Sequence, residues 1–313
     1  MKNIDKPKVL LSGACSYVGE ELLSYLVQNT DMQIIACCRN FHEQKTISSG
    51  VIYEEADLLD LRSYENIFEK YKPKYVFHLA AVTRLFSGED NPELTVKANY
   101  FGTKNIADLC EKYNSKIFIS ASSNLAREPK SVVGLTKYLS EVYLRNKSKS
   151  CRMISVRLAN VVDSKNSVSL FFKKQIADGG PVTVTDARME RRFIDKKQAV
   201  YYLMKAFENG KNKDVYVITK ENTNITNLAQ EMINESGKNI DIEFVGSKKG
   251  EKLIEESYHI DEIVNTEIQD FAILKNDWQP QKIERAINLL QNKSENTEFK
   301  FLMKKLKLSL QSD

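Results

Sequence analysis

Short apolar runs alternate with amphipathic stretches through the first half of the chain. The apolar runs lie at residues 8–13 (KVLLSG), 33–38 (QIIACC), 74–81 (KYVFHLAA) and 116–122 (KIFISAS). Helical patterns lie between them, one beginning at Glu20, one over about 63–70 and one over 94–112. Strands that alternate with helices are typical of a parallel sheet, and strands covered on both faces are apolar at nearly every position. We therefore predict an α/β fold with a Rossmann-like, doubly wound parallel sheet.

The second half of the chain is less regular. A helix is expected from Lys137 to about Arg145, followed by a buried strand at 152–162 (RMISVRLANVV) and short strands at 181–185 and 215–219. Ligands of doubly wound sheets bind at the carboxyl ends of the strands. We expect the second half to form a smaller C-terminal substrate-binding region over that edge.

These patterns divide the chain into three parts. Residues 1–165 are predicted to form a dinucleotide-binding Rossmann domain, and 166–290 a substrate-binding region, with some crossing of the chain between the two. Residues 291–313 form a basic amphipathic tail with apolar residues at helical spacing. The tail either docks on a partner or an anionic membrane surface, or packs as a terminal helix on its own domain.

Composition narrows the class of protein. The chain has 313 residues, of which 42% are apolar and 28% charged, and its net charge of +4 is too small to indicate a nucleic-acid surface. It contains no run of about 18 apolar residues, so no transmembrane segment or export signal is expected. The five cysteines are odd in number and lack metal-type spacing, so we expect neither a disulfide framework nor a metal site. A reducing cytoplasm fits this pattern best.

A glycine-rich turn follows the first predicted strand. In LLSGACSYVG, Gly13 and Gly19 frame a strand-to-helix turn that also contains Ser16, Tyr17 and Val18. Glycines let the backbone approach a pyrophosphate, and the helix N-terminus offers free amides to it. Ser16 stands where a G-x-x-G-x-x-G pattern has its middle glycine. The turn is interpreted as a dinucleotide site, the alternative being a tight turn without a ligand.

The end of the second predicted strand indicates which dinucleotide binds. QIIACCRN has no acidic residue to accept a bond from a ribose 2′-hydroxyl, and Arg39 stands there instead. An arginine pairs with a 2′-phosphate, which favours NADP over NAD, unless Arg39 is merely solvent-exposed. Asp57 is either an adenine contact or a helix N-cap. Leu58 and Ala80 complete the predicted cofactor contacts.

Several segments together resemble one family. In order along the chain they are VFHLAA, NPELTVKANYFGTKNI, FISASS, GLTKYLSE, the long segment 157–194 and GEKLIEE. Over residues 8–258 the chain resembles the extended short-chain dehydrogenases/reductases, and among them the UDP-N-acetylglucosamine 4,6-dehydratases of bacterial polysaccharide synthesis. The resemblance implies NADP on the glycine-rich turn, a nucleotide sugar as substrate, and a homo-oligomer.

The resemblance also implies which residues contact the substrate. They are 157–160 with Asn160 at the sugar diphosphate, Ser167, Val168, Arg191, Lys248 and, in the GEK loop, Glu251. Lys248 stands where the family usually has arginine, so a bidentate fork is replaced by a point charge. The alternative for Arg191 is a solvated basic edge shared with the neighbouring arginines, and Lys248 is open to the same interpretation.

The chain departs from the family at the catalytic positions. The family oxidises the sugar C4 hydroxyl with a tyrosine that a lysine one turn later supports, and eliminates water with an aspartate and a lysine. Val133 stands at the tyrosine position while Lys137 remains, and Asn124 and Leu125 replace the aspartate and lysine. Of the usual acid/base groups only Lys137 is left, and Ser123 keeps the hydroxyl of a threonine. Lys137 and Ser123 are the remaining catalytic candidates.

Two nearby residues are candidates for replacing the lost groups. Tyr138 follows Lys137, but it lies about 140° further round the helix than position 133, so it is expected to pack instead. His78, in VFHLAA, is interpreted as a structural residue beside the cofactor. With these groups set aside, two functions remain open. One is an NADP-dependent dehydratase, epimerase or reductase that acts on a nucleotide sugar with a non-standard active site. The other is a catalytically degenerate protein that binds both ligands and serves as a partner or sensor.

Overall fold

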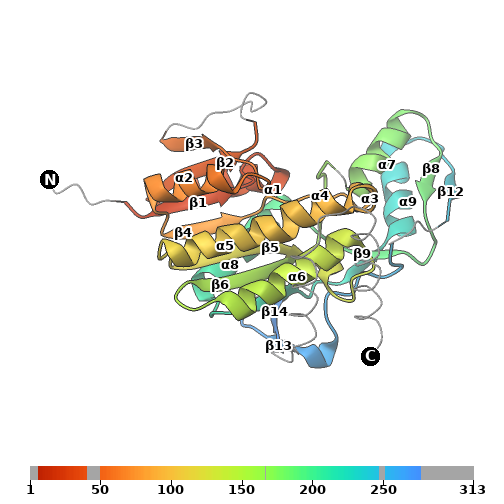
Figure 1. The fold of residues 1–313 in the computed structure, drawn as a ribbon. Helices are drawn as coiled ribbons and strands as arrows, with labels where there is room; N and C mark the ends of the chain where they lie inside the picture. Colours follow the sequence, from red (N-terminus) through yellow and green to blue (C-terminus); the bar gives the residue numbers. More distant parts are fainter. Residues whose placement is uncertain (1–5, 41–49, 166, 247–250, 276–313) are drawn as a thin grey trace.

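The computed structural model describes residues 6–40, 50–165, 167–246 and 251–275 (Figure 1). Its largest feature is a nine-stranded sheet within these residues. From edge to edge the strands are β13 (Ile263–Asn265), β14 (Phe271–Leu274), β10 (Val215–Ile218), β6 (Arg152–Leu158), β5 (Ile117–Ser123), β4 (Tyr75–His78), β1 (Lys8–Ser12), β2 (Gln33–Cys38) and β3 (Val51–Glu55). Neighbours from β10 to β3 pair in parallel, whereas β14 pairs antiparallel with β10 and β13. The predicted doubly wound parallel sheet is confirmed.

Helices cover both faces of this sheet. One face packs on α1 (Tyr17–Asn29) and α8 (Lys196–Asn209), and the other on α2 (Leu61–Tyr71), α5 (Gly102–Lys112) and α6 (Val132–Lys147) (Figure 1). Successive strand residues point to opposite faces: Leu10 joins the apolar cluster under α2 and α5, and Leu11 the one under α1 and α8. Burial on both faces explains the unbroken apolar runs in the sequence.

A smaller unit lies beside the carboxyl edge of the sheet (Figure 1). It contains α7 (Val168–Ala177) and α9 (Ile225–Ser236), the strand pair β8 (Val182–Val184) and β12 (Ile242–Phe244), and a three-stranded sheet of β11 (Asn222–Asn224), β9 (Glu190–Ile194) and β7 (Asn160–Val161). Because α8, β10, β13 and β14 rejoin the large sheet, the chain crosses between the two parts. The predicted tail, 291–313, lies outside the described residues.

Four sequence predictions differ from the structure. The helix predicted from Lys137 begins at Val132, because Ser131 is the N-cap of α6. The first helix begins at Tyr17, not Glu20, because Ser16 is its N-cap. The helix predicted over 94–112 is three pieces: α4 (Pro92–Val96), a π-helical turn at Lys97–Phe101 and α5. The predicted strand 152–162 divides into β6 and β7, which belong to different sheets. Amphipathic periodicity does not resolve a change from α to π hydrogen bonding, and an apolar run does not show where a strand leaves its sheet.

Short elements near the carboxyl edge complete the fold. They are α3 (Leu85–Asp90) and the 3₁₀ turns Asn124–Ala126 and Ile260–Glu262. Every helix in the described part of the chain is too short or too polar to span a lipid bilayer.

Candidate active site

The glycine-rich turn lies where the strand order reverses. β1 pairs with β2 on one side and with β4 on the other. The strand order therefore reverses between β1 and β4, and sheets of this kind bind ligands at that point. Gly13 has a φ of 75°, and a Cβ at this position would lie 2.6 Å from the backbone nitrogen of Ala80. Only glycine satisfies both constraints. The turn therefore packs directly against the residue predicted to be a second cofactor contact.

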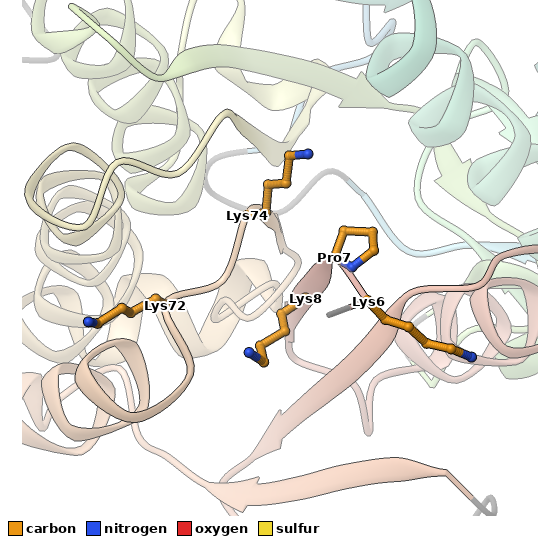
Figure 2. A pocket seen from close by; sticks show the side chains of 5 residues that line it. All are labelled: Lys6, Pro7, Lys8, Lys72 and Lys74. Atoms are coloured by element: carbon orange, nitrogen blue, oxygen red, sulfur yellow. The ribbon is translucent and has the colours of Figure 1, made fainter. Parts of the chain in front are cut away.

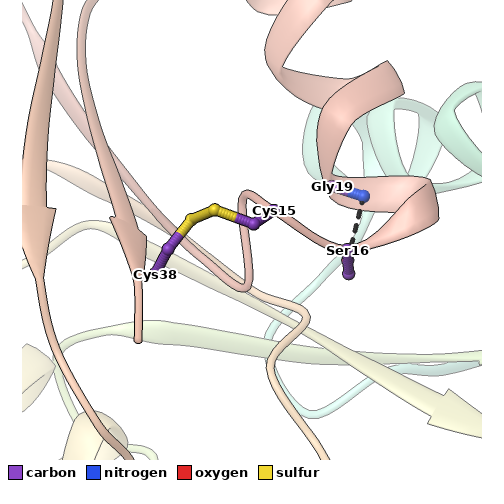
Figure 3. The surroundings of a disulfide bond; sticks show 4 residues. All are labelled: Cys15, Ser16, Gly19 and Cys38. Atoms are coloured by element: carbon purple, nitrogen blue, oxygen red, sulfur yellow. Dashed lines mark hydrogen bonds between the residues drawn. A yellow bond between two sulfur atoms is a disulfide. The ribbon is translucent and has the colours of Figure 1, made fainter. Parts of the chain in front are cut away.

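Ser16 has a defined structural role in this turn. Its Oγ accepts a hydrogen bond of 3.1 Å from the backbone N–H of Gly19, which caps α1 (Figure 3). Tyr17 and Val18 form the first helical residues, so their amides lie at the positive end of the helix dipole. A Cβ at Gly19 would also crowd the Ser16 Oγ at 2.8 Å. A serine thus fits the middle position of the turn and stabilises its helix.

The other predicted cofactor residues lie at the same edge. Arg39 is exposed directly after β2. Asp57 is not a helix N-cap: its Oδ1 accepts from the Leu59 amide at 3.0 Å, while Asp60 caps α2. The N-cap interpretation of Asp57 was therefore wrong. Leu58 packs beside α5, where a Cβ at Gly102 would lie 3.0 Å from the Leu58 Cβ.

A disulfide joins Cys15 in the glycine-rich turn to Cys38, the last residue of β2 (Figure 3). The expectation of no disulfide was wrong for this pair. The two residues are 23 positions apart, and pairing of β1 with β2 brings their Cα atoms to 5.9 Å, which is within the usual range for a disulfide. Cysteine parity and spacing do not reveal proximity that arises from strand pairing.

Lys137 lies on α6 behind the end of β5. Ser131 caps α6 by accepting from the Gly134 amide at 3.0 Å, and Lys137 Nζ donates to the Ala121 carbonyl at 2.8 Å. Burial lowers the pKa of Lys137 from its ordinary 10.5 to about 8, against the opposite effect of the Glu141 carboxylate. Ser123, two residues beyond Ala121, accepts from the Leu125 amide at 3.3 Å. Ser123 is thus the last residue of β5, and the Lys137 ammonium contacts the same end of that strand.

The substituted positions are shielded from solvent to different degrees. Val133 is 2% exposed and packs against α3, since a Cβ at Gly88 would lie 2.7 Å from the Val133 Cγ2. Glu89 of α3 accepts from the Val132 amide at 2.8 Å. Asn124 is 1% exposed, and neither its Oδ1 nor its Nδ2 has a partner among the described residues. Leu125 is half-buried.

His78 and Tyr138 do not replace the lost groups. His78 is buried with Nδ1 2.6 Å from the Ser12 hydroxyl and Nε2 2.9 Å from the Thr103 hydroxyl. The Thr103 proton goes to the Asn99 carbonyl, so Nε2 donates and Nδ1 accepts. Burial, with a smaller effect of the Lys137 charge, lowers the pKa of His78 to about 3. Tyr138 packs against the apolar cluster of α6, and burial raises its pKa to about 12.

One carboxylate connects two of the predicted substrate residues. Glu255 Oε1 lies 2.9 Å from Arg191 Nε, and Glu255 Oε2 accepts from Asn160 Nδ2 at 3.0 Å. Arg191 also donates through Nη1 to the carbonyls of Glu190 and Leu253. Arg191 is 8% exposed, so it is not part of a solvated basic edge. Its guanidinium is held in one orientation.

The other predicted substrate residues are distributed around this cluster. Ser167 caps α7 by accepting from the Leu170 amide at 3.2 Å, and Val168 begins that helix. Arg157 does not face a ligand, because its guanidinium pairs with Glu141 at 2.8 Å in the interior. Glu251 is half-buried, and Lys248 lies outside the described residues.

A shallow hollow of about 260 Å³ lies at the opposite edge of the sheet (Figure 2). It is lined by Lys6, Pro7, Lys8, Lys72 and Lys74, which lie at or just before the first residues of β1 and β4. The lysine tips point in different directions in Figure 2, so they do not converge on one ligand. Within the described residues no cluster of three or more His, Cys, Asp or Glu side chains is arranged to hold a metal ion.

Comparison with known proteins identifies the family. A family model described as polysaccharide biosynthesis protein matches residues 9–276. The chain belongs to this family. Probable polysaccharide biosynthesis protein EpsC of Bacillus subtilis is 33% identical over 271 residues, which cover 82% of this chain and 45% of EpsC. The chain therefore spans about half the length of this relative.

Two further comparisons agree in fold and sequence. UDP-N-acetylglucosamine 4,6-dehydratase (inverting) of Campylobacter jejuni is 29% identical over 259 residues, covering 79% of this chain and 76% of that protein. The X-ray structure of Pen from Bacillus thuringiensis matches with a TM-score of 0.78 and 27% identity, covering 88% of this chain and 89% of Pen. The predicted membership in a dehydratase-like group of short-chain dehydrogenases/reductases is confirmed.

Within this polysaccharide biosynthesis family fold, sequence reasoning missed two residues near the site. Glu255 lies in the GEKLIEE segment but was not predicted to be a site residue, although it pairs with both Arg191 and Asn160. Lys252 donates through Nζ to the carbonyl of Arg127, next to the segment that carries Asn124 and Leu125. Burial lowers the pKa of Lys252 to about 8. Lys252 is the lysine of the GEK loop, so its position in that loop could have marked it as a candidate site residue.

Proposed function

We propose that the chain binds NADP and a UDP-N-acetylhexosamine, and that it modifies the sugar by hydride transfer with a non-standard active site. The observation that carries the proposal is the arrangement at the carboxyl edge. The glycine-rich turn follows β1, Lys137 contacts the end of β5, and Asn160 of the Arg191–Glu255–Asn160 cluster follows β6; the strands β1, β5 and β6 occur in this order across the sheet. This is the order in which the family's cofactor, reacting sugar and diphosphate are expected.

The fit to a dinucleotide rests on the turn. Gly13 has the backbone conformation and the close approach to Ala80 that leave no room for a side chain, and α1 begins at Tyr17 with its amides toward the same space. A nicotinamide dinucleotide bound there supplies or accepts the hydride. Arg39 is exposed at the end of β2, where a 2′-phosphate would lie. This position supports NADP over NAD.

Lys137 is the group that we assign to proton transfer. A general acid or base works best when its pKa lies near the working pH, and burial brings the pKa of Lys137 to about 8. Its ammonium can give a proton to a sugar oxygen that gains negative charge as hydride arrives, and take it back in the reverse direction. The unpartnered Asn124 amide offers a donor and an acceptor to the same sugar.

These groups favour reduction or epimerisation over dehydration. Elimination across C5 and C6 needs a second acid/base pair, and Asn124 and Leu125 cannot exchange a proton at neutral pH. Oxidation or reduction at one carbon needs only the proton on oxygen, which Lys137 supplies. A 4-keto nucleotide sugar is therefore the preferred substrate class, and the names of the relatives support UDP-N-acetylglucosamine derivatives.

A second function has its own supporting observation. Helix α3 packs on Val133 through Gly88, and Glu89 binds the Val132 amide at 2.8 Å. The space beside the usual tyrosine position is thus filled by protein. A degenerate family member that binds both ligands without turnover, and acts as a partner or sensor, is consistent with this packing.

The two functions are separated by a direct assay. The purified chain is analysed for bound NADP(H) by mass spectrometry, then incubated with NADPH and either UDP-N-acetylglucosamine or its 4-keto-6-deoxy derivative. We expect the wild-type chain to reduce the keto sugar and the Lys137→Met variant to lose this turnover. Ser140→Ala, which changes an uncharged side chain one turn further along α6, should retain it. A product lighter by one water would instead establish a dehydratase, and binding without conversion would establish the degenerate function.

Arg39 provides a test of cofactor choice. Charge-assisted hydrogen bonds contribute about 1.5 to 3 kcal/mol, so Arg39→Leu is expected to weaken NADP about 10- to 100-fold. Affinity for NAD should be unchanged in the same titration. An equal loss for both dinucleotides would contradict a 2′-phosphate contact.

A further inference from the structure

The Cys15–Cys38 disulfide connects the two backbone segments that a dinucleotide would contact. Cys15 precedes Ser16, the cap of α1, and Cys38 precedes Arg39. Figure 3 shows the sulfur atoms between the turn and the end of β2, close to the capped start of α1. A dinucleotide with its pyrophosphate on α1 and its ribose at Arg39 passes across this gap.

The turn does not depend on the disulfide for its position. The backbone amides of Gly13 and Ala14 both donate to the Cys37 carbonyl, at 3.0 and 3.2 Å. These bonds hold the turn against β2 whatever the state of the sulfur atoms. Reduction therefore frees two side chains without releasing the backbone, and the reduced site keeps the geometry that the cofactor needs.

Cys15 differs from the other cysteines in its exposure to solvent. Cys37, Cys110 and Cys151 are buried, and desolvation raises the thiol pKa of Cys37 and Cys110 well above the usual range. Buried thiols in apolar surroundings are unreactive. Cys15 is only half-buried, so a small reagent can reach it at the surface of the turn. Cys38 is 5% exposed, so it reacts with the neighbouring Cys15 sulfur and not with the reagent itself.

We propose that Cys15 and Cys38 form a redox-modification site that controls cofactor affinity, with NADP binding more tightly to the dithiol form than to the disulfide form. The proposal rests on the proposed function, because it requires a dinucleotide on this turn. The bridge fills the gap between turn and strand and fixes both side chains where the adenosine ribose would lie. In the dithiol form the half-buried Cys15 side chain can rotate away from it.

The chemistry is a thiol–disulfide exchange with a low-molecular-weight disulfide such as oxidised glutathione. The Cys15 thiolate attacks one sulfur of the reagent, which forms a mixed disulfide and releases one glutathione thiol. The Cys38 thiolate then attacks the Cys15 sulfur and releases the second. The protein loses two protons and two electrons, and the reagent is reduced to two thiols.

The test compares the wild-type chain in its two redox states. Protein is equilibrated in glutathione buffers, the Cys15–Cys38 linkage is confirmed by peptide mass mapping, and NADPH binding is titrated by fluorescence. Coupling between two sites is commonly about 5- to 150-fold, so we expect the dithiol form to bind at least about 10-fold more tightly. By reciprocity, saturating NADPH should shift the glutathione ratio at half-oxidation by the same factor.

Variants locate the effect. Cys15→Ser should bind NADPH as the reduced wild type does and should not respond to oxidised glutathione. Cys110→Ala, which removes a buried thiol on the opposite face of the sheet, should keep the full response. If Cys15→Ser does not fold, the two states of the wild type decide the question alone.

The outcomes separate the two proposals. Equal NADPH affinity in both states, tighter binding by the disulfide form, or mapping of a different pair would overturn the redox site and leave the proposed function intact. If neither redox state binds NADP(H) or NAD(H), both the cofactor assignment and the redox site are overturned.

Discussion

Replacing Lys137 with methionine is expected to stabilise the fold while removing activity. The ammonium is buried, and its pKa falls from 10.5 to about 8. At about 1.4 kcal/mol for each pH unit, keeping this group charged in the folded state costs about 3 kcal/mol at pH 7. Methionine has a similar length and no charge. It also loses the bond from the charged ammonium to the Ala121 carbonyl, which costs about 1.5 to 3 kcal/mol, so a net gain of up to about 1.5 kcal/mol is expected.

The pH dependence gives the sign of the same effect. The folded-state pKa of Lys137 lies below the unfolded value, so between about pH 8 and 10.5 the unfolded chain binds more protons than the folded one. Stability contributed by this position therefore rises with pH across that window. The cost of burying the charged ammonium is fully present below pH 8. Lys137→Met should remove this cost and, with it, the contribution of position 137 to the rise in stability between pH 8 and 10.5.

The assay is urea unfolding of wild type, Lys137→Met and Ser140→Ala at pH 7 and at steps from pH 8 to 10. Ser140 is buried one turn along α6, and its hydroxyl donates to the Thr136 carbonyl at 2.8 Å, so its removal should leave the pH dependence unchanged. A methionine variant less stable than wild type at pH 7, with the same rise toward alkaline pH, would refute the buried-charge argument. Unchanged keto-sugar reduction would refute the assignment of proton transfer to Lys137.

Two further predictions concern buried polar groups. The pKa of His78 is lowered from 6.5 to about 3, so the free energy of unfolding should fall as pH drops through that range, because the unfolded chain takes up a proton that the folded chain does not. Urea unfolding of His78→Gln should show a weaker acid dependence than wild type. Glu141→Gln leaves Arg157 charged and unpaired in the interior, which should cost about 3 to 5 kcal/mol, whereas Glu93→Gln, in an exposed pair with Lys97, should cost under about 1 kcal/mol. Equal losses in denaturant midpoints would show that burial does not decide the strength of these pairs.

The sheet could be predicted because its central strands leave apolar runs at regular intervals in the sequence. β1, β2 and β4 lie within the apolar runs of the sequence and β5 ends one residue beyond its run, since a strand buried on both faces has few polar positions to interrupt it. Local exceptions were less visible. Nothing in 94–112 marks the π-helical turn at Lys97–Phe101, where Asn99 uses its side chain to bind the backbone of Val82. That contact joins distant segments, and periodicity describes only neighbours along one helix.

The same distinction applies to the site. Gly13 was identifiable because its role is local: a positive φ at a strand-to-helix turn. Glu255 was not, because its partners Arg191 and Asn160 lie 64 and 95 positions earlier in the chain. The Cys15–Cys38 pair was missed for a related reason. Residues at the carboxyl ends of adjacent parallel strands meet in space whatever their separation in sequence.

The loss of the usual tyrosine involves more than position 133. Val133 has α3 against it, with Gly88 leaving the space that its side chain fills and Glu89 bound to the adjacent Val132 amide. A phenol ring at position 133 would need that space and more, and cores resist added volume at a cost of about 1 to 3 kcal/mol. Val133→Tyr alone would therefore displace α3 before it could place a hydroxyl near Lys137. The substitution and the packing of α3 form one arrangement, and the chemistry that we propose for Lys137 needs no tyrosine at position 133.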